Sequence, residues 1–390
     1  MSIHVVNKEN IHMNLVNNIV FIKVYAELNL GDDLFIKILL ERYKNCTFYL
    51  EANSYYNQVF KDYNNIIVFK KENKYNLINK VKGFLIRKFF PKNYQKLLQS
   101  IILERNNEYF EKSDIFLSIG GSVFMQPRKL PYYYDVEYYN IISKVFKKKP
   151  IFYLGGNFGP YSDECYKHSY DKIFREATDV CFREEKSFKL FSHLNNVRFK
   201  PDIVFGLNDN NIKKIEKSIG FSIVGPKKHI REFEKEPYVK KYVSLINHFI
   251  KNGYVIKIFS FSKNEGDEII IDDIFEKINK SDKISKVYYN GDLDYFLKEY
   301  KSVESVFCGR FHSMILSMVF NQKIYPVIYS KKMTNVLEDI GYNGKVIDIK
   351  EFYHKDFTNI EKELIENIYI INNLKSNAML QFQELDKYLK

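Results

Sequence analysis

The sequence predicts an α/β protein made of two Rossmann-like domains that face a cleft, and three observations indicate this fold class. Segments typical of buried strands alternate with segments typical of helices along most of the 390 residues. A polar, asparagine-rich stretch, LNDNNIKKIEKS at 207–218, interrupts the alternation. The same alternation restarts at 219. We therefore expect a first domain over 1–206, a second over 219–350 and a C-terminal helical segment over 351–390.

The first domain is expected to begin with the strand NNIVFIKVY at 17–25, which is rich in β-branched and aromatic residues. The helix predicted next, GDDLFIKILLERY at 31–43, has Asp32 and Asp33 in its first turn. Carboxylates at that position complement the helix dipole and can cap free N–H groups. Further strands are expected at 46–52, 65–69, 114–121, 149–160 (a strand followed by a glycine-rich loop) and 179–184, with helices at 132–146 and 169–177.

The second domain repeats this pattern. Strands are expected at 219–225, 254–262, 285–290, 303–307 and 323–330, with helices at 239–253, 267–279, 292–300 and 314–320. A last helix, roughly 357–389, lies outside the alternation, and we expect it to pack back across the first domain.

Composition narrows the classes of function. The formal net charge of +12 is compatible with an anionic partner. The chain is also rich in Lys, Asn, Ile, Tyr and Phe and has no Trp, so we attribute most of the charge to compositional bias. The four cysteines lie far apart without zinc-ligand spacing, which indicates free thiols in a reducing compartment and no metal site.

Targeting signals are lacking at the N-terminus. MSIHVVNKENIHMNL has no signal-peptide pattern, and no stretch approaches the ~20 apolar residues needed to cross a bilayer. We expect a cytoplasmic protein, with peripheral contact at the inner face of the membrane left open.

A basic segment at 70–98 contains Glu72 as its one acidic residue, and part of it has apolar residues at helical spacing. Two interpretations stay open. The segment is a basic amphipathic element that rests on anionic lipid, or it is an ordinary surface helix with a lysine-rich outer face.

The most informative stretch is VESVFCGRFHSMILSMVF at 303–320. Arg310 and His312 are expected in the strand-to-helix turn at the carboxyl edge of the sheet, where open α/β sheets bind ligands. Arg310 offers a planar fork for phosphate or carboxylate, and His312 can exchange a proton near neutral pH. The alternative is a surface arginine and a helix-capping histidine. We favour an anion site because this pair lies between two segments that are both expected to be buried.

The residues from Cys308 to Gly341 resemble the C-terminal signature of the polysaccharide pyruvyl transferase family, in which an R-x-H turn precedes a buried helix and a strand leads to a tyrosine and a lysine. Arg310, His312, Tyr329 and Lys332 fit these places. Earlier motifs agree in order over roughly 20–345, namely NLGDDLF, SIGGSVF, LGGNFGP, CFREEKS and KPD. Two positions depart from the family pattern, Ser122 for a glycine and Glu184 for an aspartate.

The resemblance implies a fold similar to GT-B-type glycosyltransferases and transfer of the enolpyruvyl or pyruvyl unit of phosphoenolpyruvate to a sugar. The acceptor is expected in a cell-surface polysaccharide or its lipid-linked precursor, and the product is a pyruvate ketal of the cell envelope. We expect no cofactor besides the phosphoenolpyruvate donor and no nucleic-acid partner. Two other classes stay open. One is a GT-B-type glycosyltransferase that uses a nucleotide sugar, and the other is a non-catalytic protein that binds anionic lipid or RNA through 70–98.

The same resemblance, with the expected topology, assigns candidate site residues. His312 is the candidate for proton delivery, proton removal or both, and Asp32 either acts on a sugar hydroxyl or caps its helix. Asp267 and Glu268 follow a strand end, where ligand contact and a helix N-terminus explain them equally well. The donor candidates are Arg310, Lys332, Arg183, Ser313 and Tyr329, and the acceptor candidates are Asn29, Gly31, Gly120, Gly121 and Asn157.

Overall fold

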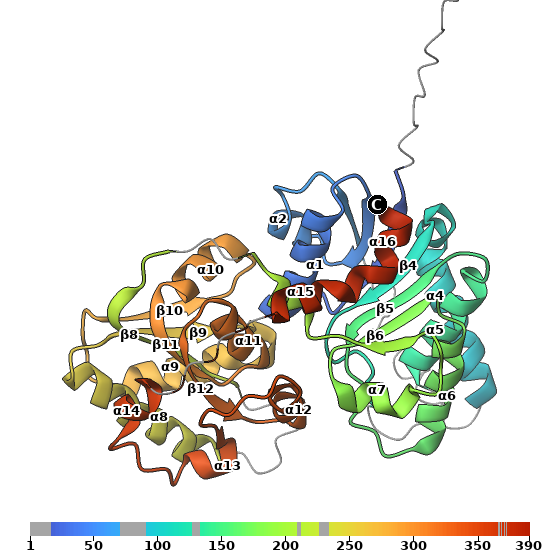
Figure 1. The fold of residues 1–390 in the computed structure, drawn as a ribbon. Helices are drawn as coiled ribbons and strands as arrows, with labels where there is room; N and C mark the ends of the chain where they lie inside the picture. Colours follow the sequence, from blue (N-terminus) through green and yellow to red (C-terminus); the bar gives the residue numbers. More distant parts are fainter. Residues whose placement is uncertain are drawn as a thin grey trace, which may run out of the picture.

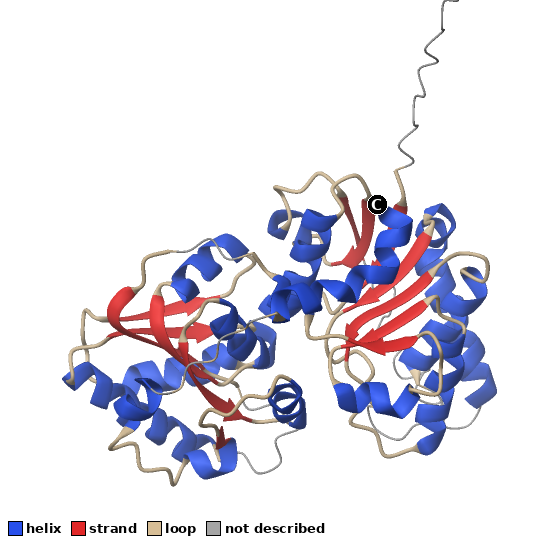
Figure 2. Ribbon diagram, viewed as in Figure 1, coloured by secondary structure: helices blue, strands red, loops and turns tan. Residues whose placement is uncertain are grey.

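Two α/β domains lie side by side in the computed structural model (Figure 1). Each has a parallel sheet with helices on both faces (Figure 2), so the predicted fold class is confirmed. The structure describes residues 17–70, 91–126, 133–208, 212–225, 234–365, 367, 369, 371 and 373–390.

The first sheet has seven parallel strands in the order β3-β2-β1-β4-β5-β6-β7. The strand order reverses between β1 and β4, which is the position where such sheets bind ligands beyond their carboxyl ends. The strands are β1 (Ile19–Lys23), β2 (Thr47–Ala52), β3 (Ile66–Lys70), β4 (Ile115–Ile119), β5 (Ile151–Gly156), β6 (Asp179–Phe182) and β7 (Val197–Phe199). The helices are α1 (Leu30–Arg42), α2 (Tyr56–Val59), α4 (Pro91–Lys112), α5 (Tyr134–Val145), α6 (Glu164–Arg175), α7 (Glu185–Phe191) and the 3₁₀ turn η1 (Ile203–Gly206).

The second sheet has six parallel strands in the order β10-β9-β8-β11-β12-β13, and its order reverses between β8 and β11. The strands are β8 (Ile215–Ser222), β9 (Val255–Ser260), β10 (Ile284–Tyr288), β11 (Val303–Cys308), β12 (Lys323–Ile328) and β13 (Ile347–Asp348). The helices are α8 (Lys235–Lys251), α9 (Asp267–Lys277), α10 (Leu293–Lys301), α11 (Phe311–Val319), α12 (Lys331–Asp339), α13 (Ile349–Phe352) and α14 (Ile360–Ile365), with the 3₁₀ turn η2 (Lys263–Glu265).

The two domains share an apolar core at their junction. One cluster of buried side chains includes Leu34 and Phe35 of α1 together with Phe311 and Met314 of α11. The α1 start is also tied to the second domain by the main chain, since Leu30 N–H donates to the Phe261 carbonyl at 3.1 Å. The carboxyl ends of both sheets therefore lie at a packed junction.

The C-terminal segment differs from the single helix predicted over 357–389. It consists of α14, α15 (Leu374–Met379), the turn η3 (Leu380–Phe382) and α16 (Gln383–Leu389). Asn367 explains the interruption, because its main-chain and side-chain groups both hydrogen-bond Ile324 of β12. The prediction of one helix was therefore wrong. Packing on the first domain is confirmed for the later part of the segment, with α15 against η1, whereas α14 packs on β12 of the second domain.

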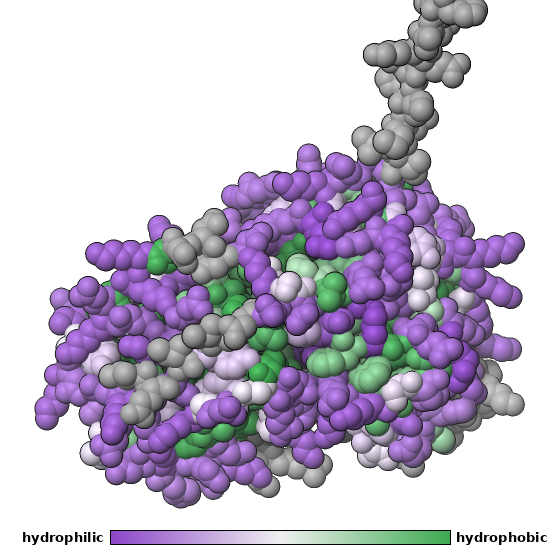
Figure 3. Space-filling model, in the orientation of Figure 1, coloured by the Kyte–Doolittle hydropathy of each residue, from purple (hydrophilic) through white to green (hydrophobic). Residues whose placement is uncertain are grey.

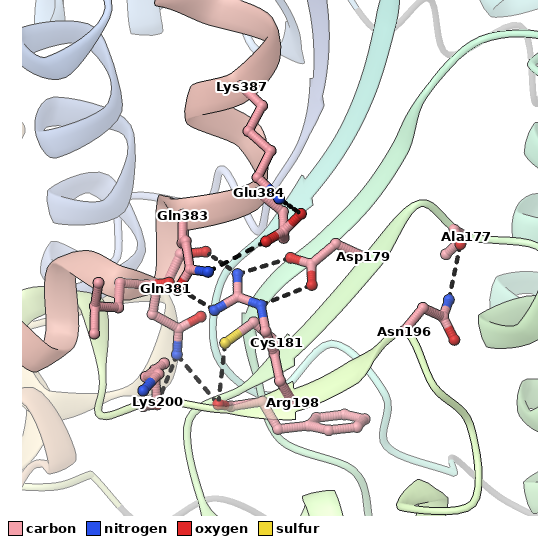
Figure 4. A network of polar contacts seen from close by, with 12 residues as sticks. Ala177, Asp179, Cys181, Asn196, Arg198, Lys200, Gln381, Gln383, Glu384 and Lys387 are labelled. Atoms are coloured by element: carbon pink, nitrogen blue, oxygen red, sulfur yellow. Dashed lines mark hydrogen bonds and ion pairs between the residues drawn. The ribbon is translucent and has the colours of Figure 1, made fainter.

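Gln381 anchors this C-terminal segment at the carboxyl ends of three strands of the first sheet (Figure 4). The side chain is fully buried, and its amide nitrogen donates to the carbonyls of Phe182, Lys200 and Pro201. Its amide oxygen accepts from the Gly155 N–H at 3.1 Å. One side chain thus links the ends of β5, β6 and β7.

The molecular face in Figure 3 is largely hydrophilic, with several apolar patches near the junction of the domains. Among the described residues, no helix is long and apolar enough to cross a bilayer. The basic segment predicted at 70–98 lies outside the described residues from 71 to 90, and its last residues belong to α4.

Candidate active site

A cavity of about 1730 Å³ lies between the carboxyl ends of the two sheets. It is large compared with the 300–1,000 Å³ typical of small-ligand sites. Nine of the twelve predicted site residues line it, namely Asn29, Asp32, Gly121, Asn157, Arg183, Arg310, His312, Tyr329 and Lys332. The structure therefore brings together residues from opposite ends of the chain.

The start of α1 supplies Asn29 and Asp32. Asn29 is the N-cap of the helix, and its side-chain oxygen accepts from the Gly31 N–H at 3.1 Å. Burial raises the pKa of Asp32 to about 7, although Arg183, Lys332 and the Gly121 amide favour its ionised form. Because Asn29 caps the helix, Asp32 is left to face the cavity as a carboxyl group that is half protonated near neutral pH.

His312 lies in the first turn of α11 and packs against the first domain. Its imidazole occupies the space beside Gly31, and its ring packs edge-on against Phe35 with 5.4 Å between centroids. Burial, followed by the charges of Arg183 and Lys332, lowers the pKa of His312 well below 6.5. The imidazole is therefore neutral at physiological pH and can accept a proton. Its Nε2 atom, 3.9 Å from Asp202 Oδ2, has no hydrogen-bond partner among the described residues.

Arg310 does not present the free positive charge expected for it. Its Nε donates to Asp267 Oδ2 at 3.0 Å, and its other nitrogens bond Asp267 Oδ1 and Glu265. These carboxylates raise the pKa of Arg310 and compensate its charge. Asp267 also accepts from the main-chain N–H groups of Gly225, Phe261 and Ser262. Asp267 thus supports the Arg310 turn, while Glu268 is not among the residues that line the cavity.

Arg183 is also held by first-domain partners. It is 2% exposed, and it bonds Asp202 Oδ2 at 3.0 Å and Asn157 Oδ1 at 2.7 Å. Its guanidinium lies 4.2 Å from the ring centroid of Phe311, so it contacts the second domain as well. A Cβ at Gly121 would lie 2.8 Å from Nη1, which explains the need for glycine there.

Lys332, at the start of α12, provides a cation that forms no ion pair among the described residues. Its Nζ lies 5.3 Å from the Phe311 ring centroid and 5.8 Å from that of Tyr329. The neighbouring Lys331 and the α12 N-cap Ser330 also line the cavity. Ser330 Oγ is buried without a hydrogen-bond partner in the described chain. A helix start with two lysines suits an anion.

Three predicted residues are not among those that line the cavity. Ser313 is fully buried, and its hydroxyl pairs with that of Tyr300 at 2.7 Å, so its side chain supports α11 rather than facing a donor. Gly31 makes room for His312. Gly120 has a φ of +133° and lies beside the Asp32 carboxylate.

Sequence reasoning missed several residues of the site. Asp202 lies in the KPD motif but received no role, and Lys331 was overlooked beside Lys332. Glu265 gave no signal because its partner Arg310 is distant in sequence. The lining as a whole has six cationic and six acidic side chains, so the cavity is not uniformly basic. The described residues contain no cluster of three or more potential metal ligands.

Comparison with known proteins adds to this geometry. The family model for polysaccharide pyruvyl transferase matches residues 29–331. The chain belongs to the polysaccharide pyruvyl transferase family. The amylovoran biosynthesis protein AmsJ of Erwinia amylovora is 20% identical over 316 residues, which cover 72% of this chain and 73% of AmsJ. The chain is thus a transferase of polysaccharide biosynthesis.

Solved structures show the same fold at low sequence identity. Anabaena Alr3699/HepE in complex with UDP and glucose has a TM-score of 0.55 and 10% identity, over 95% of this chain and 99% of that one. UDP-GlcNAc 2-epimerase from Neisseria meningitidis bound to UDP-GlcNAc has the same TM-score, identity and coverage. The Methanocaldococcus jannaschii UDP-GlcNAc 2-epimerase has a TM-score of 0.55 and 13% identity, over 95% and 99% of the two chains. This pyruvyl transferase family member therefore has a GT-B-like fold.

Proposed function

We propose that the chain transfers the pyruvyl unit of phosphoenolpyruvate to two hydroxyls of a sugar in a cell-surface polysaccharide or its lipid-linked precursor. The proposal depends on one observation: Asp32, His312 and Lys332 line the same cavity. Burial keeps the carboxyl partly protonated and the imidazole neutral, so the pair offers an acid and a base at the same pH.

The donor brings a phosphate and a carboxylate, which require positive charge. Lys331 and Lys332 at the start of α12 supply it, because the carboxylates around Arg183 and Arg310 compensate those two side chains. The two arginines instead act as fixed hydrogen-bond donors at the junction. Preorganised charge of this kind stabilises a departing phosphate without reorganisation during the reaction.

Asp32 and His312 together account for every proton transfer in the proposed reaction. Asp32 gives its proton to the methylene carbon of phosphoenolpyruvate, C2 becomes cationic, and the first sugar hydroxyl attacks C2 while neutral His312 takes the hydroxyl proton. The C2–O bond to phosphate then breaks, and His312 returns its proton to the leaving phosphate. The second hydroxyl attacks C2 and its proton restores Asp32. The products are a cyclic ketal and inorganic phosphate.

Phosphate release from phosphoenolpyruvate in the presence of glycan acceptor tests the proposal. We expect His312→Ala to lower kcat by about 10²–10⁴, the usual contribution of a general acid–base group. Near-normal turnover in that variant would remove His312 from the mechanism. Release of UDP or GDP from a sugar nucleotide, with no phosphate from phosphoenolpyruvate, would replace the proposal with a glycosyltransferase.

The cytoplasmic location and the membrane contact through 70–98 belong to the same proposal, since a lipid-linked acceptor would lie at the membrane surface. Co-sedimentation with anionic vesicles, compared with neutral vesicles, tests the contact. Binding that is equal for both vesicle types would rule out the electrostatic interaction.

A further inference from the structure

We propose that the first-domain wall of the cavity, formed by Tyr25, Met125, Tyr134 and Tyr138, is an acceptor subsite for an uncharged sugar ring. This inference rests on the proposed function, because it assigns the acceptor of that reaction. The cavity is far larger than phosphoenolpyruvate requires, so a second ligand has room beside the donor.

The wall exposes apolar surface inside the cavity. Tyr25 is 46% exposed, Tyr134 is 42% exposed and Met125 is 41% exposed, and all three line the cavity. Large side chains left exposed in a concave region mark a binding surface rather than ordinary protein surface. The apolar C–H face of a pyranose packs well on such rings, while the tyrosine hydroxyls remain able to bond sugar hydroxyls.

Tyr138 provides a second, independent observation. It is 1% exposed and lines the cavity, yet its hydroxyl has no hydrogen-bond partner among the described residues. Buried hydroxyls are nearly always paired, because an unpaired one has lost its hydrogen bonds to water without replacement. A sugar hydroxyl would supply the missing partner.

Tyr134 and Tyr138 are neighbours in space, and all four residues line the same cavity. The rings of Tyr134 and Tyr138 lie 6.3 Å apart, and Lys23 Nζ lies 4.8 Å from the Tyr138 centroid and 3.7 Å from Glu51. At the other end, burial raises the pKa of the Tyr25 hydroxyl, and the nearby carboxylates of Glu265, Glu27 and Asp32 raise it further, in that order. The wall therefore leads towards the group that we assign as the acid.

The charges of the lining favour a neutral occupant of this wall. Glu27, Glu51 and Asp135 line the cavity on the first-domain side, where Lys23 pairs with Glu51 at 3.7 Å. The lining cations that form no ion pair among the described residues are Lys186, from α7 of the first domain, and Lys331 and Lys332, from α12 of the second domain. Asp135 is held in place by the hydroxyls of Tyr166 and Tyr170 at 2.6 and 2.7 Å. An anionic sugar would be repelled by Glu27 and Asp135, whereas an uncharged ring would offer hydroxyl donors to them.

Kinetics of the full-length protein test the subsite. We expect Tyr25→Ala and Tyr134→Ala each to raise the KM for the acceptor glycan at least ~10-fold, as for loss of an aromatic anchor, and to leave the KM for phosphoenolpyruvate unchanged. Tyr25→Phe and Tyr134→Phe keep the ring and should restore most of the affinity. Tyr295→Ala is the matched control, because Tyr295 is 50% exposed on α10 and is not among the lining residues. An unchanged acceptor KM in both alanine variants would overturn the inference.

A binding measurement separates this inference from the proposed function. Saturation-transfer NMR with methyl hexopyranosides should show contacts that Tyr25→Ala and Tyr134→Ala abolish and that saturating phosphoenolpyruvate leaves in place. Methyl glucuronide, the charged member of the panel, should bind at least ~10-fold more weakly. Absence of binding by every neutral glycoside, or preference for the glucuronide, would overturn the subsite. Normal sugar binding without phosphate release from phosphoenolpyruvate would overturn the proposed function alone.

Discussion

The residues Asp32 and His312 respond in opposite ways to one physical cause. Burial disfavours the charged form of any group, so it keeps a carboxyl protonated and an imidazole deprotonated. The pKa of Asp32 is raised to about 7, and that of His312 is lowered well below 6.5. The pKa of the proposed acid, Asp32, therefore lies above that of the proposed base, His312. The protonated carboxyl and the neutral imidazole that the proposed mechanism needs coexist near neutral pH.

This order predicts the pH dependence of kcat/KM. The acidic form of Asp32 is lost as pH rises through about 7. We expect kcat/KM for phosphoenolpyruvate to fall roughly tenfold per pH unit above that value, as for loss of one proton from the free enzyme. Asp32→Asn should be much less active, and its residual activity should lack this alkaline fall. A flat profile from neutral to alkaline pH in the wild-type enzyme would exclude Asp32 as the acid.

Gly31 allows a second prediction, because the His312 ring occupies the space that a side chain at position 31 would need. A Cβ at Gly31 would overlap the imidazole. Alanine favours a helix over glycine by about 1 kcal/mol, so Gly31→Ala should not weaken α1 itself. We expect the variant to lose at least ~10²-fold in kcat, approaching the effect of His312→Ala, because its imidazole is displaced.

Gly253 is the matched control for Gly31. No atom of the described residues lies within 4 Å of the place that a Cβ would take there, but the φ of +80° disfavours alanine. Gly253→Ala should therefore lower the free energy of unfolding by about 1 kcal/mol and leave kcat unchanged. If both variants lost activity in proportion to stability, the specific contact between Gly31 and His312 would not matter for catalysis.

Residue positions and residue partners differ in how well the sequence predicts them. Arg310 and His312 could be placed at a cavity because a turn between two buried segments has a defined position in a parallel sheet. The compensation of Arg310 by Glu265 and Asp267 could not be predicted, since it depends on how the α9 start meets the α11 start. The buried contact of His312 with Gly31 depends on domain packing, which no local pattern encodes.

Among the elements, the C-terminal segment has a role that its place in the sequence does not suggest. The family match ends at 331, whereas Gln381 bonds the carbonyl of Phe182 and that of Pro201. These residues directly precede Arg183 and Asp202, the buried ion pair beside His312. The segment thus holds the chain directly before these two site residues, and Figure 4 shows the contact of Gln381 with Lys200.

We therefore expect Gln381→Ala to impair catalysis as well as stability. It leaves buried carbonyls without a donor, at about 1–3 kcal/mol for each unsatisfied group, and releases the chain that positions Arg183. Thermal unfolding measures the first effect, and kcat at a temperature where the variant is folded measures the second. Gln383→Ala is the control, because the Gln383 side chain is exposed and bonds only its neighbour Glu384 among the described residues. Loss of stability with normal kcat would limit Gln381 to a structural role.

The elements also show where periodicity fails as a guide. Strand β8 begins at Ile215, inside the stretch predicted as linker. Its first three residues are exposed and two of them are charged, although Ile215 still pairs with Val303 of β11. The helix predicted over 357–389 is broken where Asn367 bonds the edge of β12. Both errors arise because hydrogen bonds to a neighbouring element determine the backbone conformation there. The local composition does not indicate which element will be that neighbour.

At the scale of the whole molecule, the site exists only while the two domains stay together. Asp32 and Arg183 come from the first domain, and His312 and Lys332 come from the second. Asp33, next to Asp32, is a fully buried joint between the domains, since its carboxyl accepts from Tyr56 at 2.9 Å and from Tyr289 of the second domain at 2.6 Å. Burial raises the pKa of Asp33 to about 7, while both tyrosines favour its ionised form.

The hydrogen bond between Asp33 and Tyr289 should make the stability of the domain contact dependent on pH. The raised pKa of Asp33 means that its ionisation costs stability as pH rises towards about 7, and the Tyr289 hydroxyl offsets part of that cost. Tyr289→Phe should therefore lower the free energy of unfolding by ~1 kcal/mol at about pH 5.5, where Asp33 is neutral, and by ~2–3 kcal/mol at about pH 8.5, where it is charged. Urea denaturation at both pH values measures the difference. Tyr300→Phe is the control, because the Tyr300 hydroxyl bonds Ser313 and Ser317 within the second domain. Equal losses at the two pH values in Tyr289→Phe would mean that Asp33 does not ionise at the junction.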